Sequence, residues 1–117
     1  MKGLAPVLFA LAFLGLGGLA FGADEATIQH GEKVYTYWCA TCHGPGALPG
    51  TVALETKYKG AKPAMLSERT DLIPAVTKTF VRHGVSIMPF FRKTEITDAD
   101  LDALAAYLAR NSKTPSR

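Results

Sequence analysis

The pentapeptide Cys39-Ala40-Thr41-Cys42-His43 decides how the rest of this 117-residue chain is interpreted. It contains the only two cysteines of the sequence. A disulfide between them would close a tiny loop and would leave the remainder of a small domain without a covalent staple. The two thiols and the adjacent imidazole are therefore expected to bind one and the same group.

The spacing within the pentapeptide is the pattern of covalent c-type haem attachment. The two vinyl groups lie on one side of the porphyrin, and the two intervening residues let the thiols of Cys39 and Cys42 reach both of them. The next residue, His43, is then carried beneath the iron as its proximal ligand. The predicted cofactor is therefore one covalent haem c, held by the two cysteines and ligated by the histidine.

A redox dithiol and half of a zinc site are the alternatives for the same two cysteines. A thioredoxin-like dithiol is expected in a βαβ setting, and the sequence shows no such pattern. A structural zinc ion would need two further ligands, for which only His30 and His83 remain. Both histidines lie on or at the edge of predicted helices, so neither is assigned any chemistry.

An electron carrier needs a sixth ligand on the haem iron, and Met88 is the leading candidate. Pro89 follows it, so this segment is expected to be irregular and free to present the thioether to the iron. Met65 is the rival, but its neighbours favour packing in the core. A soft thioether favours ferrous iron, so His43/Met88 ligation would raise the reduction potential and leave no open site for oxygen. No catalytic residue is predicted on this chain.

Three helices are predicted around these residues, and no segment alternates apolar and polar residues for long enough to form a strand. The first helix covers residues 26–38 and the second covers residues 71–82. The third begins at the capping-box pair Thr97 and Asp100 and ends near residue 110. The predicted fold class is all-α, with three main helices and haem-wrapping loops.

The second helix and the segment before it are predicted in more detail. Thr70 or Asp71 is expected to cap this helix, and Gly84 is expected to end it. Residues 44–63 are rich in proline and glycine, so they are expected to form a wrapping loop with at most a short turn over residues 52–58. The apolar stripe expected on the second helix consists of Ile73, Val76, Phe80 and Val81.

Residues 1–22 are expected to be a signal peptide for export. Met1-Lys2 gives a weak basic start, an uncharged apolar run follows, and small residues at Ala20 and Gly22 mark a cleavage site. The mature protein would then be a single periplasmic domain, residues 23–117, that leaves the membrane after cleavage. An uncleaved anchor is the alternative, because the apolar run is slightly longer than the usual core of a signal peptide.

The charge balance of the chain excludes one class of partner. The formal net charge is +3, and removal of residues 1–22 takes away Lys2 alone, which leaves +2. Proteins that bind nucleic acid through the phosphate backbone usually carry a strongly basic surface. No nucleic-acid partner is therefore predicted.

With these residues placed, the chain resembles class I cytochromes c over nearly the whole of residues 26–110. The pentapeptide near the start, the late Met88-Pro89 pair and a terminal helix carry this resemblance. In that family a glycine and an aromatic residue of the first helix pack against an aromatic residue of the last helix. The positions similar to these are Gly31, Tyr35 and Tyr107.

The resemblance also implies a hydrogen bond that orients the proximal histidine. In class I cytochromes c the backbone carbonyl of a proline accepts a hydrogen bond from the histidine ring, as is common for residues that support a metal ligand. Pro49 is similar to that proline, and Pro45 is the alternative.

A narrower resemblance covers residues 80–91, extending into the terminal helix. This stretch is similar to the small cytochrome subunit of flavocytochrome para-alkylphenol dehydrogenases, of the p-cresol methylhydroxylase and eugenol hydroxylase type. Residues 50–70 depart from the shorter cytochrome of the p-cresol enzyme. The resemblance implies that a flavoprotein subunit oxidises a para-substituted phenol, that this haem accepts the electrons one at a time, and that a downstream acceptor receives them.

Two other functions are weighed against the flavocytochrome subunit. One is a free soluble cytochrome c that carries electrons from another dehydrogenase to a terminal oxidase. The other is a haem enzyme or gas-binding protein in which the sixth position of the iron is open. Ligation of the iron by Met88 would favour either electron carrier, the subunit or the free cytochrome, over a haem protein with an open sixth position.

A docking surface for a redox partner is expected beside the sixth ligand. Pro89, Phe90 and Phe91 could form an apolar patch there, although the two phenylalanines could instead cover the haem. Scattered basic residues are often ordinary solvated surface. Those expected to surround the patch are Arg92, Lys93, Lys57, Lys59 and Lys62.

Overall fold

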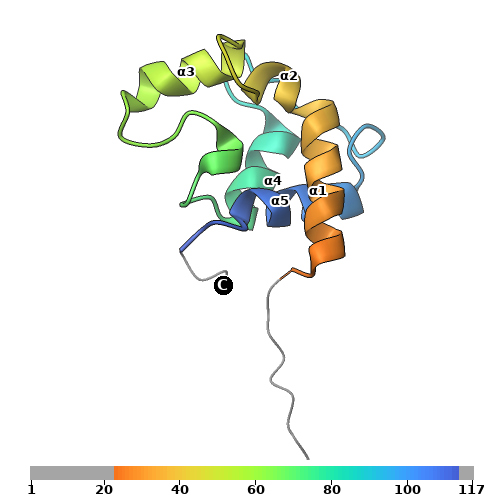
Figure 1. The fold of residues 1–117 in the computed structure, drawn as a ribbon. Helices are drawn as coiled ribbons and strands as arrows, with labels where there is room; N and C mark the ends of the chain where they lie inside the picture. The colour runs from red at the N-terminus through yellow and green to blue at the C-terminus, as the bar shows by residue number, and fades with distance from the viewer. Residues whose placement is uncertain (1–22, 114–117) are drawn as a thin grey trace, which may run out of the picture.

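The computed structural model of the chain describes residues 23–113 (Figure 1). The signal peptide predicted at residues 1–22 lies outside the described residues. Between residues 23 and 113 the protein is helical, and its one strand-like feature is an isolated bridge between Val85 and Met88. The predicted all-α fold class is confirmed. No helix of residues 23–113 is both long and apolar enough to cross a membrane.

Five α-helices and one 3-10 turn make up the described part of the chain. In order they are α1 (Glu25–Trp38), α2 (Ala40–His43), α3 (Pro49–Tyr58), η1 (Leu66–Glu68), α4 (Pro74–His83) and α5 (Asp98–Ala109). The helices α1 and α5 pack against each other, α4 packs on α5, and the short α2 connects α1 to α3 (Figure 1). The pentapeptide therefore lies at the end of the core helix α1.

The contact between α1 and α5 forms the centre of the core. At Gly31 a Cβ atom would come within 2.1 Å of the Ala103 carbonyl oxygen, so only glycine lets the two backbones approach this closely. Beside it the rings of Tyr35 and Tyr107 pack with their centroids 5.6 Å apart. The contact that the family resemblance implies between these positions is present.

The caps of these two helices follow local sequence signals. Asp24 accepts a hydrogen bond from the backbone N–H of Thr27 at 2.7 Å, which satisfies one of the free donors at the start of α1. Thr97 accepts one from the backbone N–H of Asp100 at 3.1 Å, as the capping pattern predicts for α5. Both helices lie within a residue or two of their predicted bounds.

The wrapping loop predicted over residues 44–63 is wrong at its centre, where α3 forms. Pro49 occupies the first turn of this helix, where its missing N–H has no intrahelical partner to lose. At the other end Lys59 and Gly60 adopt left-handed backbone conformations, with φ of 47° and 82°, and terminate the helix. Proline and glycine therefore mark the two ends of α3 instead of preventing it, and the fold has more than three main helices.

The helix α4 begins at Pro74 rather than at residue 71, and neither Thr70 nor Asp71 caps it. The Asp71 carboxylate instead accepts hydrogen bonds from Nε and Nη2 of the buried Arg69 at 2.6 and 2.9 Å. These bonds hold the pKa of Asp71 well below its usual range. Pro74 starts the helix with its fixed φ, and Gly84, with φ of 68°, ends it as predicted.

The apolar stripe predicted for α4 does not all pack into the protein core. Thr77 and Val81 are the buried residues of this helix, whereas Val76 and Phe80 are 37% and 43% exposed. Among the described helices, α4 packs on α5 and has at most a marginal contact with any other. One apolar side of α4 is therefore only partly covered by protein within residues 23–113.

Candidate haem site

The pentapeptide folds into one helical turn. Cys39 ends α1 and precedes α2, and its carbonyl oxygen accepts hydrogen bonds from the backbone N–H groups of Cys42 at 3.0 Å and His43 at 2.8 Å. Residues three and four apart lie on the same face of a helix. The structure therefore brings together the two thiols predicted to hold the haem and the imidazole predicted to ligate it.

His43 is held in place from two sides. The Tyr35 hydroxyl donates a hydrogen bond to the His43 carbonyl oxygen at 2.7 Å. Gly50 of α3 lies against the imidazole ring, and a Cβ atom there would be only 2.7 Å from Nδ1. The Thr51 hydroxyl donates to the Gly44 carbonyl at 2.7 Å and so fastens α3 to the end of α2. The ring is thus positioned by close backbone contacts that the sequence pattern did not reveal.

The Nδ1 atom of His43 is buried and has no hydrogen-bond partner among the described residues. The hydrogen bond to a carbonyl of Pro49 or Pro45, implied by the family resemblance, is therefore not made. Burial lowers the pKa of His43 and favours the neutral imidazole, which is the form that ligates a metal. Because Nδ1 lies against Gly50 of α3, Nε2 is the ring nitrogen left to ligate a metal.

The environment of the thiols does not suit a redox dithiol. Cys39 and Cys42 are both free, the first half-buried and the second exposed. Burial raises the pKa of the Cys39 thiol to about 12, and the neighbouring Cys42 adds to this effect. Redox dithiols depend on a thiol whose pKa is lowered. The structure therefore disfavours this alternative.

The two remaining histidines of the chain have other partners. His30 Nε2 lies 2.7 Å from an Asp100 carboxylate oxygen, which links α1 to α5. His83 Nδ1 lies 2.9 Å from the Thr79 carbonyl oxygen within α4. No group of three or more potential metal-ligating His, Cys, Asp or Glu side chains occurs within residues 23–113. A zinc site that uses the cysteines therefore finds no further ligands here.

Met88 lies in the loop between α4 and α5, where a tight turn fixes its backbone. Val85 N–H donates to the Met88 carbonyl at 3.1 Å, and Met88 N–H donates to the Val85 carbonyl at 2.9 Å. Ser86, the first central residue of this turn, has a positive φ of 53°, as such a turn requires. At Gly84 a Cβ atom would be 2.7 Å from the Met88 carbonyl oxygen. The half-buried methionine is therefore presented by a rigid loop, outside any helix.

An aromatic contact fastens the two halves of the candidate site together. Trp38, which directly precedes Cys39, packs edge-on against Phe91 with ring centroids 5.8 Å apart. Cys39 and Met88 pack against the same buried core cluster as these two rings. The turn that carries His43 and the loop that carries Met88 therefore belong to one packed unit. Sequence reasoning missed the pairing of Trp38 with Phe91, because no local pattern relates residues so far apart.

The surroundings of the pentapeptide fit a large apolar group. The helix α3 packs on α2, and α4 packs on α5, but α3 and α4 have at most a marginal contact with each other. Val52 of α3 and Val76 and Phe80 of α4 remain 37–43% exposed. A domain of this size has little apolar surface to leave uncovered. The partly exposed apolar side chains, the free thiols and the neutral imidazole of His43 together fit a covalently held haem.

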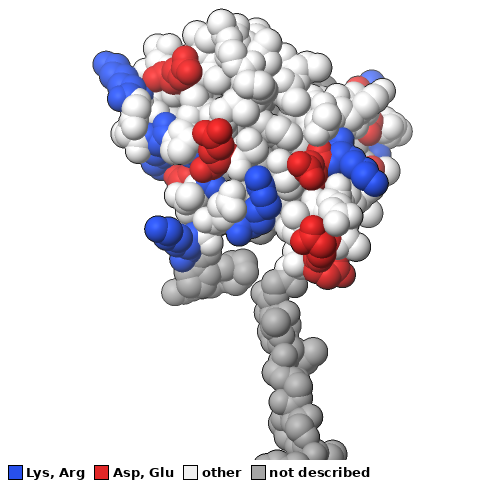
Figure 2. Space-filling model, in the orientation of Figure 1, with Lys and Arg blue, Asp and Glu red and all other residues white. Residues whose placement is uncertain are grey.

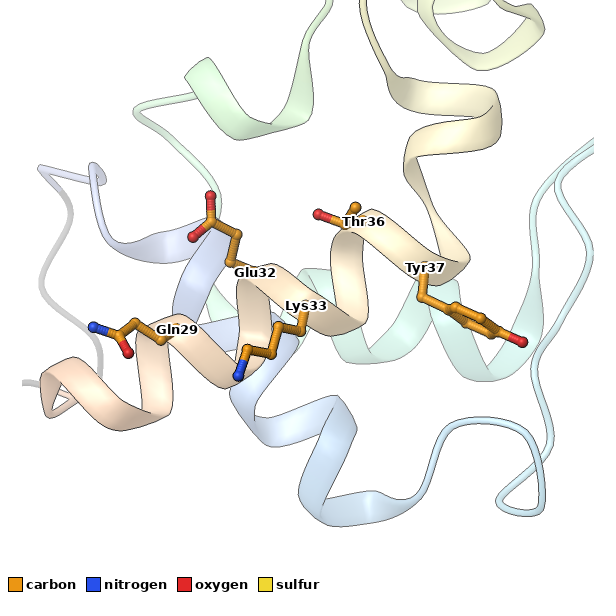
Figure 3. A pocket seen from close by; sticks show the side chains of 5 residues that line it. All are labelled: Gln29, Glu32, Lys33, Thr36 and Tyr37. Carbon is orange, nitrogen blue, oxygen red and sulfur yellow. The ribbon is translucent and has the colours of Figure 1, made fainter.

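A shallow hollow on α1 lies outside this site. Its lining consists of exposed side chains from one side of α1, all of which point into solvent: Gln29, Glu32, Lys33, Thr36 and Tyr37 (Figure 3). A surface formed by a single helix cannot enclose a cofactor. The hollow is therefore a feature of the helix surface and not a second binding site.

The chain is similar to known cytochromes. A protein family described as cytochrome c oxidase, cbb3-type, subunit III matches residues 26–108. A cytochrome c6 of Cyanidioschyzon merolae is 30% identical over 88 residues, which cover 75% of this chain and 78% of the relative. A cytochrome c6 of Pyropia yezoensis is 28% identical over 106 residues, which cover 91% and 88%. No solved structure is a significant match.

Proposed function

Because this chain belongs to the class I cytochrome c family, we propose that it is a periplasmic electron carrier in which Cys39 and Cys42 hold the haem while His43 and Met88 ligate the iron. Membership of the family brings with it one covalent haem c and an electron-transfer role rather than an enzymatic one. Catalysis is therefore expected on a partner. The signal-like sequence of residues 1–22 supports export and a mature domain of residues 23–117.

The observation that supports the ligand assignment is the contact of Trp38, at the end of α1 directly before the Cys39–His43 turn, with Phe91 in the loop that carries Met88. When bound, haem c supplies an iron centre that exchanges one electron. The protein is expected to keep the positions of His43 and Met88 unchanged while the iron gains or loses an electron. Gly50 and the Tyr35 hydroxyl fix the turn of His43, and the backbone hydrogen bonds of Val85 fix that of Met88. Such rigidity supports electron transfer without rearrangement of the ligands.

Carbon monoxide distinguishes this carrier from a haem enzyme or gas-binding protein. We expect the ferrous holoprotein at neutral pH to bind the gas slowly or not at all, because Met88 occupies the sixth position. The Met88→Ala variant is the positive control and should bind the gas rapidly. Binding is measured from the change in the haem absorption spectrum. Rapid binding of carbon monoxide by the unaltered protein would contradict the proposal and favour an open sixth position.

We further propose that the electron donor is a flavoprotein that oxidises a para-substituted phenol of the eugenol or 4-cresol type. The support is the similarity of residues 80–91 to the small subunit of flavocytochrome para-alkylphenol dehydrogenases. In the structure these residues run from the end of α4 through the turn that carries Met88 to Phe91. The similar stretch is therefore the one that surrounds the proposed sixth ligand. A free carrier serving another dehydrogenase is the alternative.

Co-purification from the native host tests the proposed donor. We expect the affinity-tagged holoprotein to recover a flavin-containing protein in near-equal amount, identified by the flavin absorption. Addition of 4-cresol or eugenol to the recovered complex should reduce the haem, which a protein carried along by chance would not do. Recovery of the cytochrome as a free monomer only, with no phenol-dependent haem reduction, would favour the free carrier.

A further inference from the structure

The carbonyl oxygen of His43 is bound by a side chain from another helix. Because α2 ends at His43, this carbonyl has no partner within the helix. The Tyr35 hydroxyl of α1 donates to it at 2.7 Å. Burial raises the pKa of Tyr35 to about 12, although a hydrogen bond from the Ser67 side chain and the charge of Arg110 act against this rise. The hydroxyl therefore stays protonated at neutral pH and keeps donating to the turn of the proposed proximal ligand.

The ring of Tyr35 is held by the end of α5. Tyr35 and Tyr107 are both buried, and their ring centroids lie 5.6 Å apart. The guanidinium carbon of Arg110 lies 3.9 Å from the centre of the Tyr107 ring, which is within the range of a cation–π contact. Arg110 therefore packs on the ring that packs on Tyr35.

The same guanidinium joins the end of α5 to η1, which packs against that helix (Figure 1). Arg110 Nη1 donates to the Tyr107 carbonyl at 2.7 Å, and Arg110 Nη2 donates to the Ser67 carbonyl at 3.0 Å. Asn111 Nδ2 donates to the same Ser67 carbonyl at 3.3 Å. Ser67 is the residue whose side chain offers a hydrogen bond to the Tyr35 hydroxyl. Arg110 thus contacts both neighbours of Tyr35, Tyr107 beside the ring and Ser67 beside the hydroxyl.

Capping of α5 accounts for only part of this arrangement. A basic side chain near a helix C-terminus binds the last carbonyl groups and interacts favourably with the helix dipole. The bond from Arg110 to the Tyr107 carbonyl has this effect. The bond to Ser67 and the contact with the Tyr107 ring are not needed for a cap, and they use the planar, forked shape that distinguishes arginine from lysine.

The surface charge of the protein does not explain the position of Arg110 either. The residue is exposed overall, and exposed arginines usually extend their guanidinium groups into water. On the face shown in Figure 2, acidic and basic groups are interspersed rather than separated by sign. Mixed charges of this kind give no reason for one arginine to fold back onto the protein. The contacts with Tyr107 and Ser67 therefore indicate the role of Arg110 better than any shared field of charge.

We propose that Arg110 is a positioning residue of the proximal haem ligand, which acts through Tyr35 on the backbone of His43. The inference rests on the proposed function, because it takes His43 as the ligand of a covalently held haem. Arg110 holds Tyr107 and Ser67, these two hold the ring and the hydroxyl of Tyr35, and the hydroxyl holds the His43 carbonyl. Because the thioethers fix the haem itself, a shift of this carbonyl would change the angle of the imidazole ring to the haem.

Proton NMR spectra of the ferric holoprotein test this role, because the shifts of the haem methyl groups depend on the orientation of the axial ligands. Tyr35→Phe keeps the ring and removes the hydroxyl, so we expect it to change the pattern of methyl shifts. Arg110→Ala should change the pattern in the same direction. If Arg110 acts through Tyr35, adding Arg110→Ala to Tyr35→Phe should produce no further change. Additive changes in the double variant, or unaltered methyl shifts in Arg110→Ala, would overturn the proposal.

Ser112→Ala is the matched control, because it removes another hydrogen bond made by the residues that follow α5. The Ser112 hydroxyl donates to the Leu72 carbonyl at 2.5 Å rather than to η1. We expect Ser112→Ala to lower the melting temperature, as Arg110→Ala does, but to leave the haem methyl shifts unchanged. Equal changes of these shifts in both variants would show that general loosening of this end of the chain causes them, and Arg110 would then have no positioning role.

Amide hydrogen exchange in the ferrous holoprotein is a second measurement of the same effect. The Cys42 and His43 N–H groups both donate to the Cys39 carbonyl and so report on the turn. In Tyr35→Phe we expect both to exchange about fivefold faster, the factor expected for the loss of one hydrogen bond. Unchanged exchange would contradict the proposal.

A failure of the proposed function is distinguishable from a failure of this inference. If His43 does not ligate the iron, the ferric spectrum of the unaltered protein will show no strongly shifted signals from the His43 ring. If those signals are present but Arg110→Ala leaves the haem methyl shifts unaltered, the positioning role of Arg110 alone is refuted.

Discussion

Haem is expected to be absent from denatured protein in which both attachment residues are replaced, Cys39→Ser together with Cys42→Ser. Each thiol adds across one vinyl group and forms one thioether bond, and serine hydroxyls do not form this bond. The check is haem staining after denaturing electrophoresis, together with the mass of the purified chain. Haem that remains attached to the denatured double variant would show that the attachment residues are wrongly assigned.

The same double variant is expected to lose most of its folding stability. Without the haem, Val76 and Phe80 on α4 stay 37% and 43% exposed, and among the described helices α3 packs chiefly on α2. Covering a large apolar side chain contributes about 1.5–3 kcal/mol, and a small domain is stable by only about 5–15 kcal/mol. Circular dichroism during heating should show a broad transition at low temperature in place of a cooperative one.

The single variants and a neighbouring substitution are the controls for this experiment. Cys39→Ser or Cys42→Ser alone leaves one thioether, so we expect covalent haem at reduced yield. Thr41→Ser changes an exposed residue between the two cysteines and should leave both haem attachment and stability unchanged. Loss of haem in Thr41→Ser would mean that the turn itself, rather than the thiols, limits attachment.

The features that the sequence predicted correctly are those with local causes. Thr97 and Asp100 cap α5 because side chain and backbone lie within one turn, and the spacing of Cys39, Cys42 and His43 places them on one helical face. These signals need no knowledge of distant contacts. The ends of α1 and α5 and the thiol–imidazole cluster could therefore be predicted without the structure.

The features that the sequence did not predict depend on where a proline stands within a helix, or on contacts between residues that are far apart in the sequence. The prolines and glycines of residues 44–63 predict a loop, yet Pro49 in a first turn favours a helix, and α3 forms there. Val76 and Phe80 have the helical spacing of a core face but are only partly covered by protein, because periodicity does not say what covers an apolar face. The contact of Trp38 with Phe91 joins distant segments and has no local signal.

Met88→Ala is expected to abolish the weak sulfur-to-iron band in the red spectrum of the oxidised holoprotein. The band requires a thioether bound to iron, and alanine offers no ligand. Because the thioether stabilises ferrous iron, the reduction potential should fall by on the order of 0.1 V or more, within the wide range that axial ligands control. Visible absorption and a redox titration of the purified holoprotein give both quantities.

Met65→Ala is the control that separates the two methionines. Met65 directly precedes η1 and is half-buried, so its replacement removes similar volume without removing the proposed ligand. We expect this variant to keep the red band; loss of the band here, with retention in Met88→Ala, would transfer the ligand role to Met65. Unfolding is not expected to mimic ligand loss in Met88→Ala, because the turn is closed by backbone hydrogen bonds to Val85 that need no thioether. Unchanged far-ultraviolet circular dichroism together with a lost band would therefore identify Met88 as the iron ligand.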